Sequence, residues 1–199
     1  MHIHLVRHGE VDNPHDVVYA DVAGFSLSAR GRAQASAAGA HLGTRPPFRI
    51  VSSPLDRALA TARLIADGTG AFVDVDDRLT EWGLAVRWRG ATWHRLPIVF
   101  PGELEAYLDD PAHLAFCPEP LDQLSARMCG AILEWCATVR GDLVFVSHED
   151  PLHAARLRLL GTMPTAFHKD KPGHGSVITL ERAGDTWRTV ASWVPPAMP

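Results

Sequence analysis

The feature that most constrains the fold of this chain is a short apolar run near its beginning. It occupies residues 5–10, LVRHGE, and ends in charged and imidazole side chains. Such a run is typical of a buried β-strand whose last residues reach a ligand. An imidazole there can attack an electrophile such as phosphorus, and the neighbouring guanidinium can hold its oxyanions. Gly9 is predicted to let the backbone turn sharply and to leave room for a ligand.

Two later segments repeat this pattern. Residues 49–51, RIV, precede a pair of serines, and residues 143–146, LVFV, precede Ser147 and His148. Ligands of open α/β sheets bind at the carboxyl ends of the strands. We therefore expect the polar side chains that follow these strands to converge at one end of a sheet.

Hydrophobic periodicity alternates between strand and helix along the chain. Strands are expected over 2–7, 49–52, 72–75 and 143–147, with a terminal hairpin over 176–180 and 186–193 around Gly184-Asp185. Helices are expected over 28–42, 53–66, 121–139 and 150–161, with Ser28, Ser53 and Asp150 as N-caps and Pro54 at a first helical position. The alternation predicts one α/β domain over residues 1–199, a three-layer sandwich with a central, mostly parallel mixed sheet and helices on both faces.

Two segments lack a clear period. Residues 11–27 are rich in Asp, Gly and Pro and are predicted to form a substrate loop. Residues 76–120 carry Trp82, Trp88 and Trp93 among prolines and are predicted to form a small irregular cap over the site. The tryptophans could offer apolar contacts or stacking to a substrate, or they could pack the cap itself.

Composition narrows the function classes. The formal net charge of −4 gives no bulk attraction to nucleic acid or to anionic membranes. Three cysteines, Cys117, Cys129 and Cys136, form no CxxC pair and indicate a reducing compartment rather than a disulfide framework. The sequence shows no basic-then-apolar leader and no apolar run of about 18 residues. We therefore expect a soluble, cytoplasmic protein.

Five ordered motifs together resemble the histidine phosphatase superfamily, in its phosphoglycerate mutase-like branch. They are RHGE at 7–10, LSARGRAQA at 27–35, SSPLDRALATA at 52–62, Glu81, and VSH at 146–148. They occur in the family's order and span nearly the whole chain. The resemblance implies a phosphoglycerate mutase-like fold and hydrolysis of a phosphomonoester without metal or organic cofactor.

The resemblance also assigns roles. His8 would attack phosphorus and become a phosphohistidine, Arg7 and Arg57 would clamp the phosphoryl oxygens, and His148 would donate to the same group. Glu81 would be the general acid; Glu10, Asp76 and Asp77 are the other candidates. For His8 to attack, one ring nitrogen must be unprotonated, so a carbonyl or carboxylate should hold the other.

Two positions depart from the family's pattern. Asn13, a candidate phosphate contact, lies one residue closer to Arg7 than its family counterpart and is followed by Pro14. The histidine at 148 is followed by Glu149 rather than glycine. A carboxylate beside a phosphate site would repel substrate unless it turned away, or it could bind a cationic part of a substrate. The loop residues His15, Tyr19 and Ser26 could line the pocket, and Lys169, Lys171 and His174 could contact substrate, but all six are expected at the solvated surface.

Alternative functions remain open at this point. The phosphohistidine could return its phosphoryl group to a bound acid, as a phosphoglycerate mutase does, or the chain could bind phosphate without turnover. A metal enzyme is disfavoured, because His148 and His153 are five residues apart and so cannot share a helix face; His2-Ile3-His4 is the other metal-like motif. The expected partner is a phosphorylated small molecule, with phosphoprotein and a homodimer left open.

Overall fold

The computed structural model describes residues 1–43, 48–162, 167–184 and 186–197. Its sheet has six strands in the order β3-β2-β4-β1-β5-β6. The strands are β1 (His2–Arg7), β2 (Phe48–Ser52), β3 (Val73–Val75), β4 (Asp142–Ser147), β5 (Val177–Ala183) and β6 (Thr186–Trp193). The first four run parallel, while β5 and β6 are antiparallel to their neighbours. The predicted strands and the mixed, mostly parallel sheet are confirmed; Asp185 of the predicted turn lies outside the described residues.

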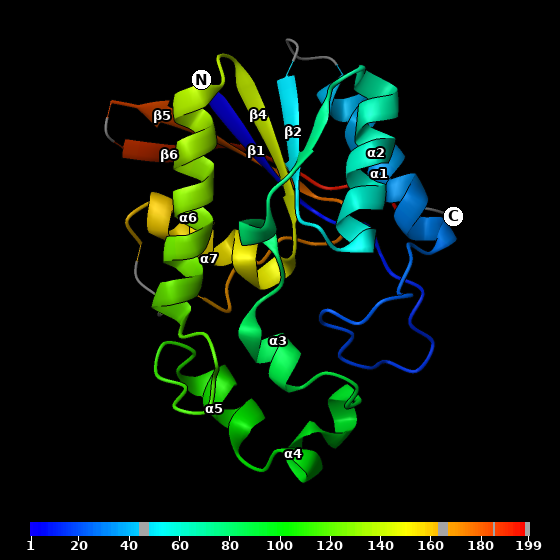
Figure 1. Ribbon diagram of the computed structural model, residues 1–199, viewed down its shortest axis with the longest axis vertical. Coiled ribbons are helices and arrows are strands. Elements are labelled where there is room, and N and C mark those ends of the chain that lie inside the picture. Colours follow the sequence, from blue (N-terminus) through cyan, green and yellow to red (C-terminus); the bar gives the residue numbers. More distant parts are fainter. Residues whose placement is uncertain (44–47, 163–166, 185, 198–199) are drawn as a thin grey trace.

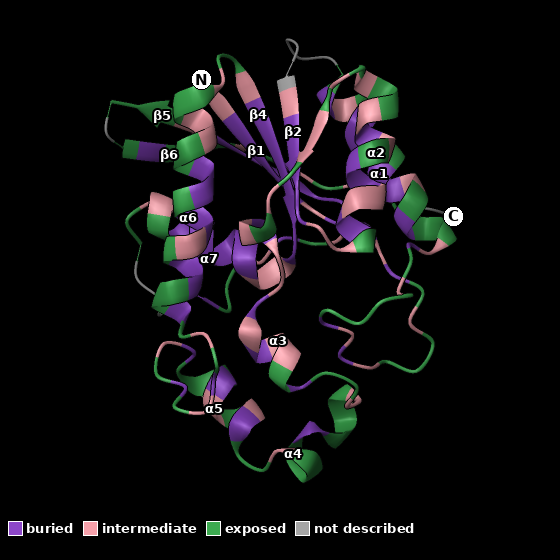
Figure 2. Ribbon diagram, in the orientation of Figure 1, coloured by how far each residue is buried: buried purple, intermediate pink, exposed green. Residues whose placement is uncertain are grey.

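Helices cover both faces of the sheet (Figure 1). Helices α1 (Ala29–Leu42) and α2 (Asp56–Thr69) pack on one face, and α6 (Leu121–Thr138) and α7 (Glu149–Leu159) pack on the other. Alternation along the strands explains the layers, since successive side chains of a strand point to opposite faces. In β1, Ile3 and Leu5 belong to the cluster that includes α6 and α7, whereas Val6 packs with α1 and α2. Figure 2 shows the central strands buried between these helices.

The register of the sheet aligns the carboxyl ends of β1, β2 and β4. Arg7 pairs with Ser147, and Ser52 pairs with Val146. The ladder continues one step further, because the His8 amide donates to the Ser147 carbonyl at 3.0 Å and the Ser53 amide to the Val146 carbonyl at 2.9 Å. The three polar segments that follow these strands therefore start from one edge of the sheet, as predicted.

Helix starts agree with the sequence only in part. Ser28 caps α1 as predicted, and its hydroxyl accepts from the Gly31 amide. The predictions for Ser53 and Asp150 were wrong: α2 begins at Asp56 after Leu55, and α7 begins at Glu149 after His148. Ser53 Oγ bonds to distant His148 and, locally, accepts only from the Leu55 amide just before α2, while the Asp150 carboxylate bonds to Lys171.

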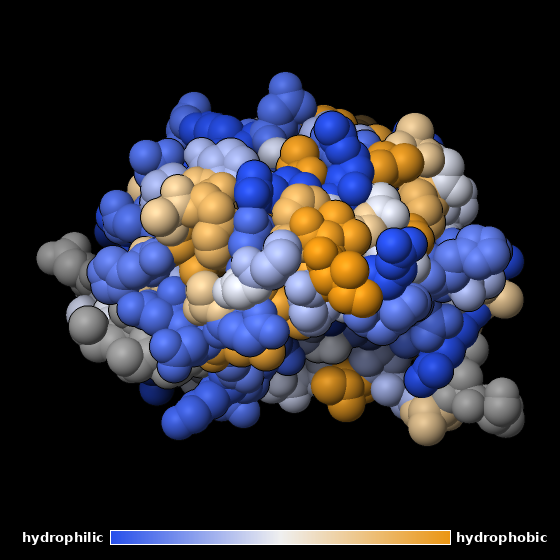
Figure 3. All heavy atoms as spheres, turned by 90° about the horizontal axis from the view of Figure 1, so that it is seen from below, coloured by the Kyte–Doolittle hydropathy of each residue, from blue (hydrophilic) through white to orange (hydrophobic). Residues whose placement is uncertain are grey.

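The segment that was predicted as a cap folds into short helical pieces. These are η1 (Asp77–Leu79), α3 (Gly83–Arg87), η2 (Trp93–Arg95), α4 (Leu96–Val99) and α5 (Glu103–Asp109). They lie at the end of the molecule where the parallel strands finish (Figure 1). Seen from that end, apolar side chains gather at the surface (Figure 3); the exposed large ones in this segment are Trp93, Ile98, Val99 and Leu108. Trp82 and Trp88 are buried, so these two pack the segment.

Residues 11–27 form a long loop that is tied to the same segment. Backbone hydrogen bonds join Val18 to both Gly90 and Ala91, and Val17 pairs with Thr92 in an isolated bridge. Within the described residues, no helix is long and apolar enough to span a membrane.

Candidate active site

A cavity of about 390 Å³ lies at the carboxyl ends of the strands. Arg7 and His8 line it from the end of β1, and residues 16–20 line it from the long loop. The segment over 76–120 contributes Glu81, Ala85, Trp93 and Tyr107, and Glu149, Asp150 and His174 also line the cavity. The cavity thus collects groups that follow β1 and β4 in the chain, together with groups from the long loop and from residues 76–120.

His8 is held in the form that a nucleophile needs. Its Nδ1 lies 2.8 Å from the Gly9 carbonyl oxygen, which can only accept, so Nδ1 carries the proton. Nε2 is therefore unprotonated and accepts from Arg57 Nε at 3.2 Å. Burial, together with the positive charges of Arg57 and Arg7, holds the pKa of His8 well below its usual value. The imidazole is neutral at physiological pH, and its nucleophilic lone pair is on Nε2, where it accepts from Arg57.

Gly9 has a different role from the one predicted. The φ angle of Gly9 is not positive, so the backbone here does not need the conformational freedom of glycine. A Cβ at this position, however, would lie 2.2 Å from the carbonyl oxygen of Gly31 in α1. Gly9 is therefore required because the loop after β1 passes against the helix backbone, which leaves no room for a side chain.

Arg57 is almost fully buried, with 2% of its area exposed. It lies in the first turn of α2, and its Nη2 donates to the carbonyl of Ala20 at 2.8 Å. Ala20 has a φ of 41°, a left-handed conformation that is costly for alanine and common at ligand sites. The guanidinium lies 4.7 Å from the centre of the Tyr19 ring. The prediction that Tyr19 belongs to the solvated loop surface was wrong, whereas His15 and Ser26 are exposed as expected.

Arg7 lines the same cavity as His8. Its Nη1 donates to the Pro172 carbonyl at 3.0 Å and contacts the Glu149 carboxylate, and its Nη2 lies 2.9 Å from His174 Nε2. Burial and the Arg7 charge lower the pKa of His174 to about 4, so this ring is neutral and accepts from Arg7. The solvated-loop prediction for His174 was therefore wrong.

His148 supplies a second imidazole, with its ring centre 5.3 Å from that of His8. Its Nε2 lies 2.8 Å from Ser53 Oγ, while Ser53 Oγ also accepts from the Leu55 amide at 3.3 Å. The serine hydroxyl can donate its proton to Nε2, and in that tautomer the ring proton of His148 is on Nδ1. Among the residues that the structure describes, buried Nδ1 has no hydrogen-bond partner, which leaves it as a donor for a ligand.

The Glu81 carboxylate lies beside Arg57 and His148. One oxygen, Oε1, accepts from the Trp82 amide at 3.0 Å, and Oε2 lies 3.4 Å from Arg57 Nη2 and 3.6 Å from His148 Nδ1. Burial raises its pKa above the usual value for glutamate. A carboxyl group with a raised pKa beside two cationic or imidazole groups can both donate and accept a proton.

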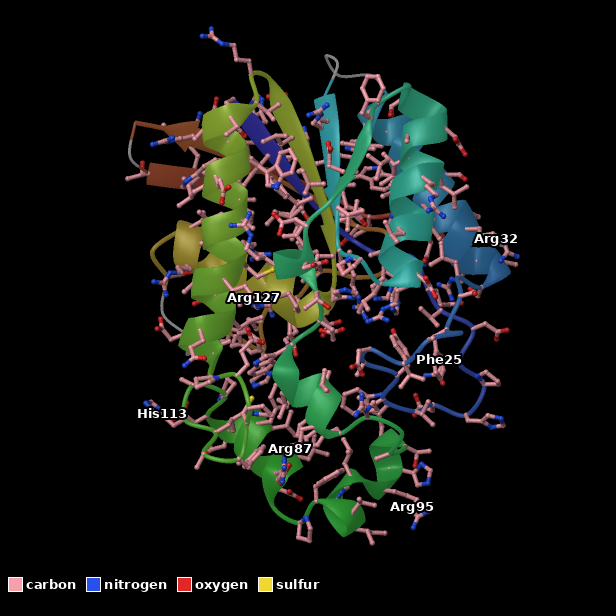
Figure 4. The ribbon with its side chains drawn as sticks, viewed as in Figure 1. Phe25, Arg32, Arg87, Arg95, His113 and Arg127 are labelled. Atoms are coloured by element: carbon pink, nitrogen blue, oxygen red, sulfur yellow. The ribbon has the colours of Figure 1, made fainter. Side chains whose placement is uncertain are left out.

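Arg127 on α6 holds the backbone that carries Glu81 (Figure 4). Its Nη1 donates to the Arg78 and Thr80 carbonyls, and its Nη2 lies 3.4 Å from the Glu81 carbonyl. The Glu119 carboxylate pairs with the same guanidinium and accepts from the Gly83 amide at 3.1 Å. Neither residue follows a recognisable strand end, so the sequence alone offered no signal for them.

The other acid candidates have different surroundings. The Glu10 carboxylate accepts from Ser28 Oγ at 2.9 Å at the start of α1. Asp76 accepts from Arg78 and from the Trp135 indole, and Asp77 lies in η1. Asn13 lines the cavity, but its amide oxygen and nitrogen both bond to the backbone of Val17. This amide orders the long loop from within.

The metal-like histidine motifs have other neighbours. His2 Nδ1 pairs with Asp142 at 3.2 Å, and His4 Nδ1 lies 3.0 Å from Thr179 Oγ1. His153 packs with its ring 5.4 Å from that of Phe167. In the described part of the chain, no three His, Cys, Asp or Glu side chains are grouped so that they could hold a metal ion.

Comparison with known proteins agrees with this architecture. A model of the histidine phosphatase superfamily (branch 1) matches residues 3–194. The chain therefore belongs to the histidine phosphatase superfamily.

Individual relatives fall on both sides of the phosphatase and mutase division. A glucosyl-3-phosphoglycerate phosphatase of Mycolicibacterium vanbaalenii is 38% identical over 190 residues, covering 92% of this chain and 84% of that protein. A 2,3-bisphosphoglycerate-dependent phosphoglycerate mutase of Thermoplasma acidophilum is 32% identical over 153 residues, with 76% and 72% covered. The solved structure of a mycobacterial glucosyl-3-phosphoglycerate phosphatase with VO3 superposes with a TM-score of 0.85 at 29% identity, covering 95% of this chain and 96% of that one.

Proposed function

We propose that this protein is a phosphatase that hydrolyses a phosphomonoester through a phosphohistidine on His8, without a metal ion. The observation that carries the proposal is the state of His8. Its Nδ1 proton is held by the Gly9 carbonyl, and its Nε2 lone pair lies beside the buried Arg57 in the cavity. A neutral imidazole that is fixed in one tautomer and feels the positive charges of Arg57 and Arg7 is suited to attack on phosphorus.

In the first step, His8 Nε2 attacks phosphorus and the bond to the leaving oxygen breaks. Arg7, Arg57 and His148 Nδ1 donate to the phosphoryl oxygens, whose charge they offset. Glu81 gives its proton to the leaving alcohol. In the second step, the Glu81 carboxylate takes a proton from water, the water oxygen attacks phosphorus, and the N–P bond breaks to release phosphate and free His8.

We also propose that residues 76–120 act as a cap whose side chains select the alcohol. Ala85, Trp93 and Tyr107 of this segment line the cavity together with Glu81. The leaving alcohol of a phosphomonoester bound at His8 would therefore contact them. This arrangement supports a phosphorylated small molecule as the substrate.

The first experiment is an assay of the purified protein on an aryl phosphate with excess chelator, beside His8→Ala. Turnover that resists the chelator and is lost in the variant is the expected result. Trapping of a labelled phosphoryl group that is stable to base and labile to acid would identify the phosphohistidine. Turnover that persists in His8→Ala would refute the proposal.

One relative is named a phosphoglycerate mutase, so mutase activity is the second function to be tested. A mutase would return the phosphoryl group of His8 to a bound acid rather than to water. Incubation with 3-phosphoglycerate, followed by phosphorus NMR, separates the two reactions: free phosphate supports the phosphatase, and an isomeric phosphoglycerate supports the mutase.

A further inference from the structure

Arg7, which we propose as a phosphate-binding residue, already contacts an anion of the chain itself. Its Nη1 meets the carboxylate of Glu149, the first residue of α7. The two side chains are 16% and 34% exposed, so solvent weakens the pair only in part. A phosphoryl group that binds Arg7 must therefore compete with Glu149.

A second cation lies on the other side of the same carboxylate. Lys171 Nζ is 3.6 Å from Glu149 Oε1. Bonds of 2.5 Å to Asp150 and 2.6 Å to the Tyr107 hydroxyl hold the ammonium, which also lies 4.7 Å from the centre of the Phe167 ring. These contacts fix Lys171 in place, so the prediction of a solvated side chain was wrong. Its ammonium can pair with the Glu149 carboxylate without moving.

We propose that Glu149 sets the affinity of the site for phosphoryl groups by competing with them for Arg7. In the free protein Glu149 bridges Arg7 and Lys171, and in the complex the phosphoryl oxygens take Arg7 while Glu149 keeps only Lys171. This inference rests on the proposed function, since it requires that Arg7 bind the phosphoryl group. Glu149 is a specificity-determining residue here and takes no part in proton transfer.

The exchange favours ligands with high charge density. Displacing a carboxylate from a guanidinium is easier for a dianionic phosphate that offers several oxygens than for a monoanion. If Arg7 is unpaired in about a tenth of the free molecules, the apparent dissociation constant for phosphate is raised about tenfold. Removing the Glu149 charge removes this competition.

The test is the dissociation constant for inorganic phosphate, measured by calorimetry on the full chain. Glu149→Gln keeps the shape of the side chain, and we expect it to bind phosphate about tenfold more tightly, a change of about 1.4 kcal/mol. Asp16→Asn is the matched control, because Asp16 lines the same cavity and, among the described residues, forms no ion pair. It should change the constant by less than about twofold.

A double-mutant cycle tests the second half of the exchange. Lys171→Met should weaken phosphate binding in the presence of Glu149, and it should do so less in the Glu149→Gln background. Because Lys171→Met also unpairs Asp150, thermal unfolding of both variants is measured alongside. A gain of affinity in Glu149→Gln is a result that damage to the fold would not produce.

The outcomes separate this inference from the proposed function. If wild type binds phosphate and Glu149→Gln binds it equally or more weakly, the exchange is refuted and the phosphatase proposal stands. If wild type binds phosphate no better than an Arg57→Ala variant does, the site itself fails and the proposed function fails with it.

Discussion

Replacing Glu81 by glutamine separates the two proton transfers that we assign to it. The amide has nearly the same shape, so the hydrogen bond from the Trp82 amide to Oε1 can persist. What the variant loses is the exchangeable proton on Oε2, the oxygen that lies 3.4 Å from Arg57 and 3.6 Å from His148. Proton transfer by a positioned side chain contributes about 100- to 10,000-fold to a rate.

The size of the loss should depend on the leaving group. An alkyl phosphate needs its oxygen protonated as the bond breaks, so its turnover should fall by the full factor, about 3–5 kcal/mol in activation free energy. 4-Nitrophenolate leaves readily without a proton. The step in which 4-nitrophenyl phosphate phosphorylates His8 should therefore slow by less than about tenfold. Water activation still requires Glu81, and the phosphohistidine should therefore accumulate.

Rapid-mixing kinetics measure this directly. In Glu81→Gln, we expect a burst of 4-nitrophenol close to one equivalent per active site, followed by slow turnover. Glu10→Gln is the matched control, because its carboxylate bonds to Ser28 at the start of α1. Equal losses for alkyl and aryl substrates in the first step, or a loss in Glu10→Gln as large as in Glu81→Gln, would refute the assignment of the acid.

Three further predictions follow from individual contacts. Arg57→Lys keeps the charge but loses the fork that spans His8 and the Ala20 carbonyl, so affinity for vanadate, measured by inhibition of aryl phosphate turnover, should fall about 10- to 100-fold. Unchanged inhibition would contradict this role. Gly31→Ala places a Cβ 1.9 Å from a backbone oxygen and should lower the free energy of unfolding in urea by about 3 kcal/mol, whereas Gly130→Ala in α6, with no atom within 4 Å, should raise it by about 0.5–1 kcal/mol. A pH profile of kcat/KM should be bell-shaped and lie toward acid, because the lowered pKa of His8 keeps the nucleophile neutral in mild acid and deprotonation of Glu81 above its raised pKa removes the proton donor. The alkaline limb should disappear in Glu81→Gln; its persistence there would assign that limb to another group.

Much of the fold could be predicted because its signals are local. The apolar run over residues 2–7 predicted the strand β1, and the Ser28 cap on α1 involves a residue only three positions away. The convergence of the strand ends also followed from sequence, since parallel strands that alternate with helices have few arrangements. Arg7, His8 and His148 were therefore placed together without knowledge of any distance.

Local reasoning failed where a polar side chain had a distant partner. The sequence around Ser53 is that of a helix cap, but its hydroxyl bonds to His148, 95 residues away. The segment that carries Lys171 looks like a solvated loop, yet the ammonium is held by Asp150 and Tyr107. Secondary-structure propensity reflects interactions between residues that are close in the chain. It therefore cannot predict hydrogen bonds between residues that are far apart in the sequence.

Sequence by itself determined that Arg7, His8 and His148 lie together, because the residues that end these buried strands must emerge at one edge of the sheet. Only the tertiary structure decided their protonation states and pairings. The tautomer of His8 depends on the direction of the Gly9 carbonyl, and the raised pKa of Glu81 depends on its burial. Whether Glu149 opposes or assists phosphate depends on its distances to Arg7 and Lys171, which lie far from each other in the chain and meet only when it folds.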